Sequence, residues 1–144
     1  MHIVPATWVD REDLAALRRA LWPDAGDGDI ARMLHEPARF AAFIAREPNC
    51  GAIGFAEASL RHDYVNGCDT SPVGFLEGLY VVPYFRRRGV AASLVRAVEQ
   101  WTLAQGAREL ASDALIDNFD GQRMHVALGF QEVERVVSFH KRLG

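Results

Sequence analysis

Cysteine, long apolar runs and blocks of like charge are all scarce in this sequence. Only Cys50 and Cys68 are present among the 144 residues, without a CxxC pair, and the five histidines show no HxxxH or Cys/His ligand spacing. We therefore expect neither a disulfide framework nor a metal site. No stretch approaches the length needed to span a bilayer, and the opening Met-His-Ile-Val-Pro lacks the pattern of a signal peptide. We expect a cytoplasmic protein without a membrane partner.

Charge of one sign is not concentrated anywhere in the chain. The formal net charge is -3, and the longest block of like charges is Arg86-Arg87-Arg88. This pattern does not support binding to nucleic acid, whereas a cationic small molecule suits a mildly acidic surface. The content of 49% hydrophobic and 24% charged residues is typical of one compact domain with a sizeable core. We therefore expect a single domain that spans residues 1–144.

Apolar alternation predicts strands, and apolar residues at three- and four-residue spacing predict helices. The strands that we expect lie at 3–7, 40–46, 51–60, 73–82, 109–114 and 133–139, and the helices at 11–22, 30–36, 89–105 and 120–128. Pro48-Asn49 predicts a hairpin turn, Asp120 is a candidate helix cap, and Gly129 is placed to end the last helix in a left-handed conformation. The order β-α-α-β-β-β-α-β-α-β predicts an α/β protein with a mixed sheet and helices on its faces. On pattern alone, several folds remain open.

The segment 81–91, Val-Val-Pro-Tyr-Phe-Arg-Arg-Arg-Gly-Val-Ala, joins a predicted strand to a predicted helix through a basic turn. A helix N-terminus exposes unpaired N–H groups that favour a phosphate, and Gly89 and Ala91 let the backbone approach it. Charge-assisted contacts are available from three arginines, Arg86, Arg87 and Arg88. In isolation, the pattern is equally compatible with a basic surface turn. The strand before it, the helix after it and the downstream run 128–130 favour the phosphate site.

This segment resembles the acetyl-CoA signature of the GNAT superfamily of N-acetyltransferases, with Arg86, Gly89 and Ala91 at the matched positions. The resemblance implies the GNAT fold, a central and mostly antiparallel sheet with a splayed strand pair and flanking helices. It also implies a bulge in the strand before the turn, for which Gly78 is a plausible position. Acetyl-CoA is the implied co-substrate, and its pantetheine arm is implied to pair with a free strand edge. The implied cofactor contacts are Leu79, Tyr80, Val81, Arg86, Arg87, Arg88, Gly89, Val90, Ala91, Ala92 and Asn118.

Glu77 interrupts the apolar run 75–79, on the alternate-residue face that also shows Phe75, Leu79 and Val81. A carboxylate on such a face is expensive to bury without a partner. A structural explanation is a bulge that turns Glu77 to solvent, or an arginine that pairs with it. We favour a catalytic role, in which Glu77 holds the ammonium group of an amine substrate and passes its proton on through water.

A second candidate catalytic residue is His125. GNAT members often place a tyrosine four residues before the glycine of a Gly-Phe pair, where it protonates the departing thiolate, and His125 stands at that position. Histidine can serve as an acid near neutral pH, although a histidine on a short helix is more often packed or solvated. Asp113 and Asn118 follow a predicted strand, where ligands commonly bind in mixed sheets, with turn or capping roles as the alternative.

Four further runs, at 60–67, 75–81, 111–114 and 132–137, are similar to the aminoglycoside 6'-N-acetyltransferases. This resemblance implies an aminoglycoside acceptor, in a pocket lined by Trp22, Tyr64, Glu77, Asp113 and Glu134. Carboxylates neutralise the ammonium groups of a polycationic amino sugar, and aromatic rings stack on its sugar faces. Each residue also has an ordinary alternative, such as the end of a helix for Trp22, a solvated loop for Tyr64, and a strand charge paired with Arg135 for Glu134.

We expect direct acetyl transfer within a ternary complex, which needs no covalent acyl-enzyme. Neither cysteine has a neighbouring histidine in the sequence that would indicate one. Two alternatives remain open. The same fold acetylates other amines, such as a polyamine, an amino acid or a protein N-terminus, and a non-catalytic acyl-CoA sensor needs the same cofactor site. Related enzymes are often dimers, and by that analogy the Val-rich C-terminal strand supports a homodimer.

Overall fold

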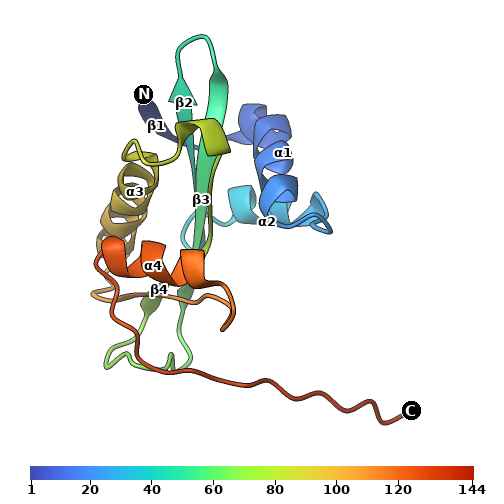
Figure 1. Ribbon diagram of the computed structural model, residues 1–144, viewed down its shortest axis with the longest axis vertical. Coiled ribbons are helices and arrows are strands. Elements are labelled where there is room, and N and C mark those ends of the chain that lie inside the picture. Colours follow the sequence, from blue (N-terminus) through green and yellow to red (C-terminus); the bar gives the residue numbers. More distant parts are fainter.

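All residues from 1 to 144 are described by the computed structural model, in which five strands form one sheet (Figure 1). The strands lie side by side in the order of the sequence: β1 (His2–Pro5), β2 (Phe40–Glu47), β3 (Gly51–Arg61), β4 (Val73–Val81) and β5 (Leu110–Ser112). Neighbours from β1 to β4 are antiparallel, and only β4 and β5 are parallel. The predicted mixed and mostly antiparallel sheet is confirmed.

Helices cover both faces of the sheet. The α3 face is covered by α3 (Val90–Ala104), and the α1 face, opposite to it, by α1 (Arg11–Leu21) and α2 (Gly28–His35) (Figure 1). The fourth helix, α4 (Phe119–Ala127), follows β5, and short 3-10 turns, η1 (Trp8–Asp10) and η2 (Pro83–Phe85), precede α1 and α3. Gly129, just beyond α4, has a φ of 96° and so adopts the predicted left-handed conformation.

The apolar stripes that predict the helices form two separate cores. Leu94 and Val98, one turn apart on α3, are fully buried against the sheet, in a cluster that also holds Leu76 of β4. Leu14 of α1 and Phe55 of β3 are fully buried in the second cluster, on the α1 face. The sheet is therefore buried on both faces along β3.

One extra residue in β4 shifts its pairing with β3 and sets the environment of Glu77. Glu57 pairs with Gly78, while the next residue of β3, Ala58, pairs with Leu76, so that Glu77 has no partner in the ladder. The predicted bulge is thus present, but its unpaired residue is Glu77 rather than Gly78.

The bulge also reverses the alternation of side chains along β4. Leu79 and Val81 belong to the cluster under α3, whereas Glu77 accepts a hydrogen bond from Ser59, whose ladder partner is Phe75. Residues paired in a ladder share a face, so Glu77 shares a face with Phe75. The prediction that Leu79 and Val81 also lie on this face is wrong. After the unpaired residue, each side chain of β4 lies on the face opposite to the one that simple alternation predicts.

The parallel pair β4 and β5 separates after a short contact. Gly74, Phe75 and Leu76 pair with residues 110–112, and no pairing follows beyond Leu76 and Ser112. The predicted strand at 109–114 is therefore too long. The edge of β4 that faces β5 has no strand partner from Glu77 to Val81, which is the splayed arrangement that the GNAT resemblance implies.

The C-terminal residues 131–144 form an exposed arm that extends away from the body of the molecule (Figure 1). The strand predicted at 133–139 is not formed, because an apolar alternation becomes a strand only where a neighbouring strand offers its N–H and C=O groups. Val137 and Phe139 are 72% and 93% exposed. This arm carries apolar side chains that nothing in the single chain covers.

Candidate functional site

The turn from β4 to α3 presents a concave run of backbone. Arg87 and Gly89 both have positive φ, 62° and 81°, and Gly89 is the N-cap residue of α3. No atom lies within 4 Å of the position that a Cβ on Gly89 would take, so the space beside the helix N-terminus is open. The first N–H groups of α3 have no partner within the helix. An open helix N-terminus with these backbone angles is a suitable binding place for a phosphate group.

The three arginines of this turn differ in their contacts. Arg86 donates from Nε to the carbonyl oxygen of Val81 at 2.8 Å, so part of its guanidinium is committed to the end of β4. The Arg88 guanidinium lies 4.7 Å from the ring centroid of Tyr84. Arg87 is exposed and forms no ion pair. The predicted basic turn is present, with Arg86 acting partly as a brace for the strand that precedes it.

Glu77 is held by two neighbours on β3. Its Oε1 accepts a hydrogen bond from Ser59 Oγ at 2.6 Å and from Arg61 Nη2 at 2.9 Å. Its side chain is 35% exposed. Both structural explanations offered by the sequence, a bulge and an arginine partner, are therefore realised, and they leave the carboxylate fixed in orientation at the surface of the sheet.

Trp22 lies against Gly78, the residue that follows Glu77. It follows α1, its ring meets Phe55 edge-on at a centroid distance of 6.0 Å, and an added Cβ on Gly78 would lie only 2.7 Å from its Cζ2 atom. Glycine at 78 is therefore what allows the indole to rest on β4. The structure brings Trp22 and Glu77 together at adjacent positions of one face, as the sequence comparison implies.

A buried ion pair beside Trp22 is not predicted by the sequence pattern. Arg18 Nη1 donates to Glu57 Oε1 at 2.8 Å, and both side chains are 7% exposed. The Arg18 guanidinium lies 5.3 Å from the Trp22 ring centroid. Burial raises the pKa of the Glu57 carboxyl to about 7, against the opposing effect of Arg18. The available signal was an acid inside the apolar run 52–60, the same kind of signal that identified Glu77.

His125 connects α4 to the end of β5. Its Nδ1 lies 2.6 Å from the carbonyl oxygen of Gly121, which only accepts, so Nδ1 carries a hydrogen. Its Nε2 lies 2.7 Å from Ser112 Oγ, and that hydroxyl is also 3.2 Å from the carbonyl oxygen of Leu76. A histidine hydrogen-bonded to a serine thus lies where β4 and β5 part.

The other predicted residues lie at the rim. Asp113 is exposed immediately after β5, and Asn118 caps α4 by accepting a hydrogen bond from the Gly121 amide at 3.0 Å, so the predicted cap at Asp120 is wrong. Tyr64 is 80% exposed in the loop after β3. Glu134, on the C-terminal arm, accepts a hydrogen bond from Asn66 of that loop. No direct contact joins these residues to Glu77 within one chain.

Comparison with known proteins agrees with this geometry. The model of the acetyltransferase (GNAT) family matches residues 8–130. Aminoglycoside N(6')-acetyltransferase type 1 of Salmonella enteritidis is 50% identical over 135 residues, which cover 91% of this chain and 92% of that protein. The protein of the same name from Acinetobacter baumannii is 45% identical, and the match covers 100% of both chains.

Solved structures extend the similarity to the whole fold. A structure of AAC(6')-Iy in complex with the bisubstrate analog CoA-S-monomethyl-acetylneamine has a TM-score of 0.91 and 46% identity, and the match covers 99% of this chain and 98% of that chain. The crystal structure of AAC(6')-Ih from Acinetobacter baumannii has a TM-score of 0.92 and 43% identity, with 99% of each chain covered.

Proposed function

The chain belongs to the acetyltransferase (GNAT) family, and from this we propose that its 144 residues form one catalytic domain that acetylates the 6'-amino group of aminoglycosides with acetyl-CoA. The loss of a positive charge weakens the antibiotic, so the activity confers resistance. The observation that carries the proposal is the free edge of β4. It runs from Glu77, beside Trp22, to the anion-binding turn that begins after Val81.

The cofactor site uses the backbone more than side chains. Acetyl-CoA, when bound, supplies the thioester whose acetyl group is transferred. The amides of α3 and its preceding turn receive the pyrophosphate, with added charge from the arginine side chains. The free edge of β4 at 79–81 pairs with the pantetheine arm as a further strand would. The residues that we assign to this site are Leu79, Tyr80, Val81, Arg86, Arg87, Arg88, Gly89, Val90, Ala91, Ala92 and Asn118.

The acceptor site lies at the other end of this edge. Glu77 holds the 6'-ammonium group and passes its proton on through water, because only the free amine has a lone pair for attack on the thioester. A backbone N–H of β4 near Val81 stabilises the negative charge that develops on the carbonyl oxygen. Trp22, Tyr64, Asp113 and Glu134 complete the pocket, with acids that bind ammonium groups and rings that stack on sugars.

The geometry of His125 supports its role as the acid. Since Nδ1 already donates its hydrogen to Gly121, the second proton of the imidazolium form is the one on Nε2, which points to Ser112 at the place where β4 and β5 part. The free edge that we assign to the pantetheine arm begins there. His125 therefore supplies a proton to the departing thiolate, in the role that tyrosine holds elsewhere in the family.

The protein acts as a homodimer in the cytoplasm in this proposal. The arm of residues 131–144 carries exposed apolar side chains, and β5 has a free outer edge, beside a groove of about 290 Å³ lined in part by Leu110 and Phe130. In a symmetric dimer, the arm of each copy pairs with the β5 edge of the other copy. Both cysteines are free thiols, as is usual in a reducing compartment.

The decisive experiment follows release of the CoA thiol with kanamycin, a polyamine, an amino acid and a peptide N-terminus as acceptors. We expect turnover with kanamycin, a product acetylated at the 6'-amine by NMR, and thermal stabilisation by acetyl-CoA and by kanamycin that is larger when both are present. Turnover with another amine but not with kanamycin would show that this other amine is the acceptor. Binding of acetyl-CoA without any turnover would instead make the protein a sensor.

A further inference from the structure

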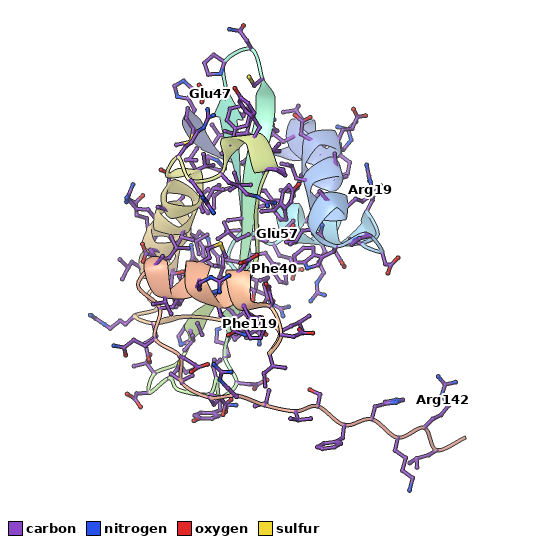
Figure 2. All side chains as sticks on the ribbon, in the orientation of Figure 1. Arg19, Phe40, Glu47, Glu57, Phe119 and Arg142 are labelled. Carbon is purple, nitrogen blue, oxygen red and sulfur yellow. The ribbon has the colours of Figure 1, made fainter.

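The pair formed by Arg18 and Glu57 is the most enclosed charged group in the molecule, and the mechanism above does not use it. It is the only ion pair in which both side chains are less than a tenth exposed. Figure 2 labels Glu57 near the centre of the molecule. Arg18 Nε has no hydrogen-bond partner, so the pair is satisfied only in part. An apolar pair of the same shape is often at least as stable, so stability alone is a weak reason for these charges.

The position of this pair is directly under the proposed acceptor site. Glu57 is the ladder partner of Gly78, the glycine on which the Trp22 ring rests. Arg18 reaches the same ring from α1, at 5.3 Å from its centroid. Two residues along β3 from Glu57, and therefore on the same face, Ser59 donates to the Glu77 carboxylate. The two carboxylates thus share one face, one from each strand.

Five charged groups set the field on this face, from every element packed around Glu57. They are Arg18 on α1, Asp29 on α2, Glu57 and Arg61 on β3, and Glu77 on β4. The partner of Glu57 on β2 is Ala42, which has no charge. With Glu57 ionised, two positive and three negative groups leave one net negative charge. With Glu57 protonated, two positive and two negative groups cancel, and Arg18 is left without its closest counter-charge.

We propose that Glu57 is a specificity-determining residue that acts through its charge: with Arg18 it orients Trp22, and in its ionised form it makes the acceptor site attractive to polycationic amines. This inference rests on the proposed function. Since burial and the nearby Asp29 and Glu77 favour the neutral form while Arg18 favours the ionised one, the balance falls close to neutral pH. Binding of an ammonium group adds positive charge to this face, so it draws Glu57 into its ionised form and releases a proton.

The test compares the wild-type chain with Glu57→Gln, the double variant Arg18→Met/Glu57→Gln, and the control Asp10→Asn. Asp10 forms a 2.7 Å ion pair with Arg46 at the other end of α1, so the control removes a carboxylate far from Trp22. The measurements are KM for kanamycin, KM for acetyl-CoA and kcat, between pH 6 and 9. Calorimetry of kanamycin binding at pH 7, in two buffers of different ionisation enthalpy, counts the protons released.

We expect KM for kanamycin to rise about tenfold in Glu57→Gln, which is the size of effect that loss of a nearby charge in a poorly solvated site produces. The rise should be smaller in the double variant, because Arg61, Asp29 and Glu77 still leave one net negative charge on this face. KM for acetyl-CoA and kcat should change little. Proton release near pH 7 should fall in both variants and persist in the control. The pH dependence separates a charge role from a structural one: ionisation of Glu57 should lower the wild-type KM for kanamycin as the pH rises through 7, and both Glu57 variants should lack this contribution.

Proton release at the wild-type level in either Glu57 variant would overturn the inference, as would an unchanged KM for kanamycin in Glu57→Gln. Equal losses in the control would overturn it too, because the effect would then follow from any broken ion pair. Failure of the wild-type chain to acetylate kanamycin refutes the proposed function itself, and it is detected before any variant is compared.

Discussion

Replacing Gly78 by alanine tests the contact that places Trp22 at the acceptor site. Gly78 lies in β4 without a positive φ, so alanine is compatible with its backbone. The added methyl group would lie 2.7 Å from Trp22 Cζ2 and 3.3 Å from Leu21 Cδ2. Carbon atoms pack best at about 3.5–4.0 Å, so the indole must withdraw by roughly 1 Å. The ring sits between β4, Phe55 and Arg18, which limits where it can move.

Overpacking of this kind costs about 1–3 kcal/mol. If the displaced Trp22 no longer stacks on the sugar, the KM for kanamycin should rise by roughly fivefold to a hundredfold, while KM for acetyl-CoA stays unchanged, because the turn at 86–92 is not touched. Steady-state kinetics measures the two KM values, and tryptophan fluorescence reports the displacement of the Trp22 ring. Gly28→Ala is the matched control, since no atom lies within 4 Å of its added Cβ. A variant with a shifted fluorescence spectrum but an unchanged KM for kanamycin would refute the assignment of Trp22 to the acceptor site.

Three further predictions concern other parts of the molecule. Glu77→Gln should lower kcat by about a hundredfold and leave acetyl-CoA affinity unchanged, and equal turnover would remove its assigned role. Because the pKa of Glu57 is raised from 4.5 to about 7, its stabilising contribution is complete below pH 4.5 and declines as the pH rises to about 7. The decline amounts to about 3 kcal/mol, which urea unfolding of wild type should show and Glu57→Gln should lack. Deletion of 131–144 should yield a monomer by light scattering, and a persistent dimer would place the interface elsewhere.

The order of elements and most of their bounds are predictable from the sequence, because periodic apolar residues and punctuating prolines act locally. The β2–β3 hairpin and the helix after Gly89 are examples, and both lie within a residue or two of their predicted limits. The local pattern of one strand does not show how its residues pair with those of the neighbouring strand. The faces of Leu79 and Val81 were predicted wrongly for this reason, since the bulge is defined only by pairing with β3.

The candidate site divides in a similar way. Glu77 is recognisable as an acid in an apolar strand, and the anion-binding turn is recognisable because its residues are contiguous. Glu57 gives the same signal as Glu77, but its partner Arg18 lies 39 positions away, on a helix whose facing side the sequence does not specify. The prediction of a C-terminal strand at 133–139 is wrong for the opposite reason. Its alternation is clear, and the partner that would turn it into a strand is absent from the single chain.

The unpaired position in β4 has a consequence for how this strand tolerates insertions and deletions. A point substitution at Glu77 does not change the pairing of β4 with β3, so the neighbouring side chains stay on the same faces of the sheet. Removing the residue altogether would restore a regular ladder in which Gly78 to Val81 keep their partners on β3, so Leu79 and Val81 would stay in the core under α3 and only the carboxylate on the acceptor face would be lost. We therefore expect homologous chains that keep a carboxylate here to keep the extra residue of β4 as well, because a regular ladder has no further position between Leu76 and Gly78.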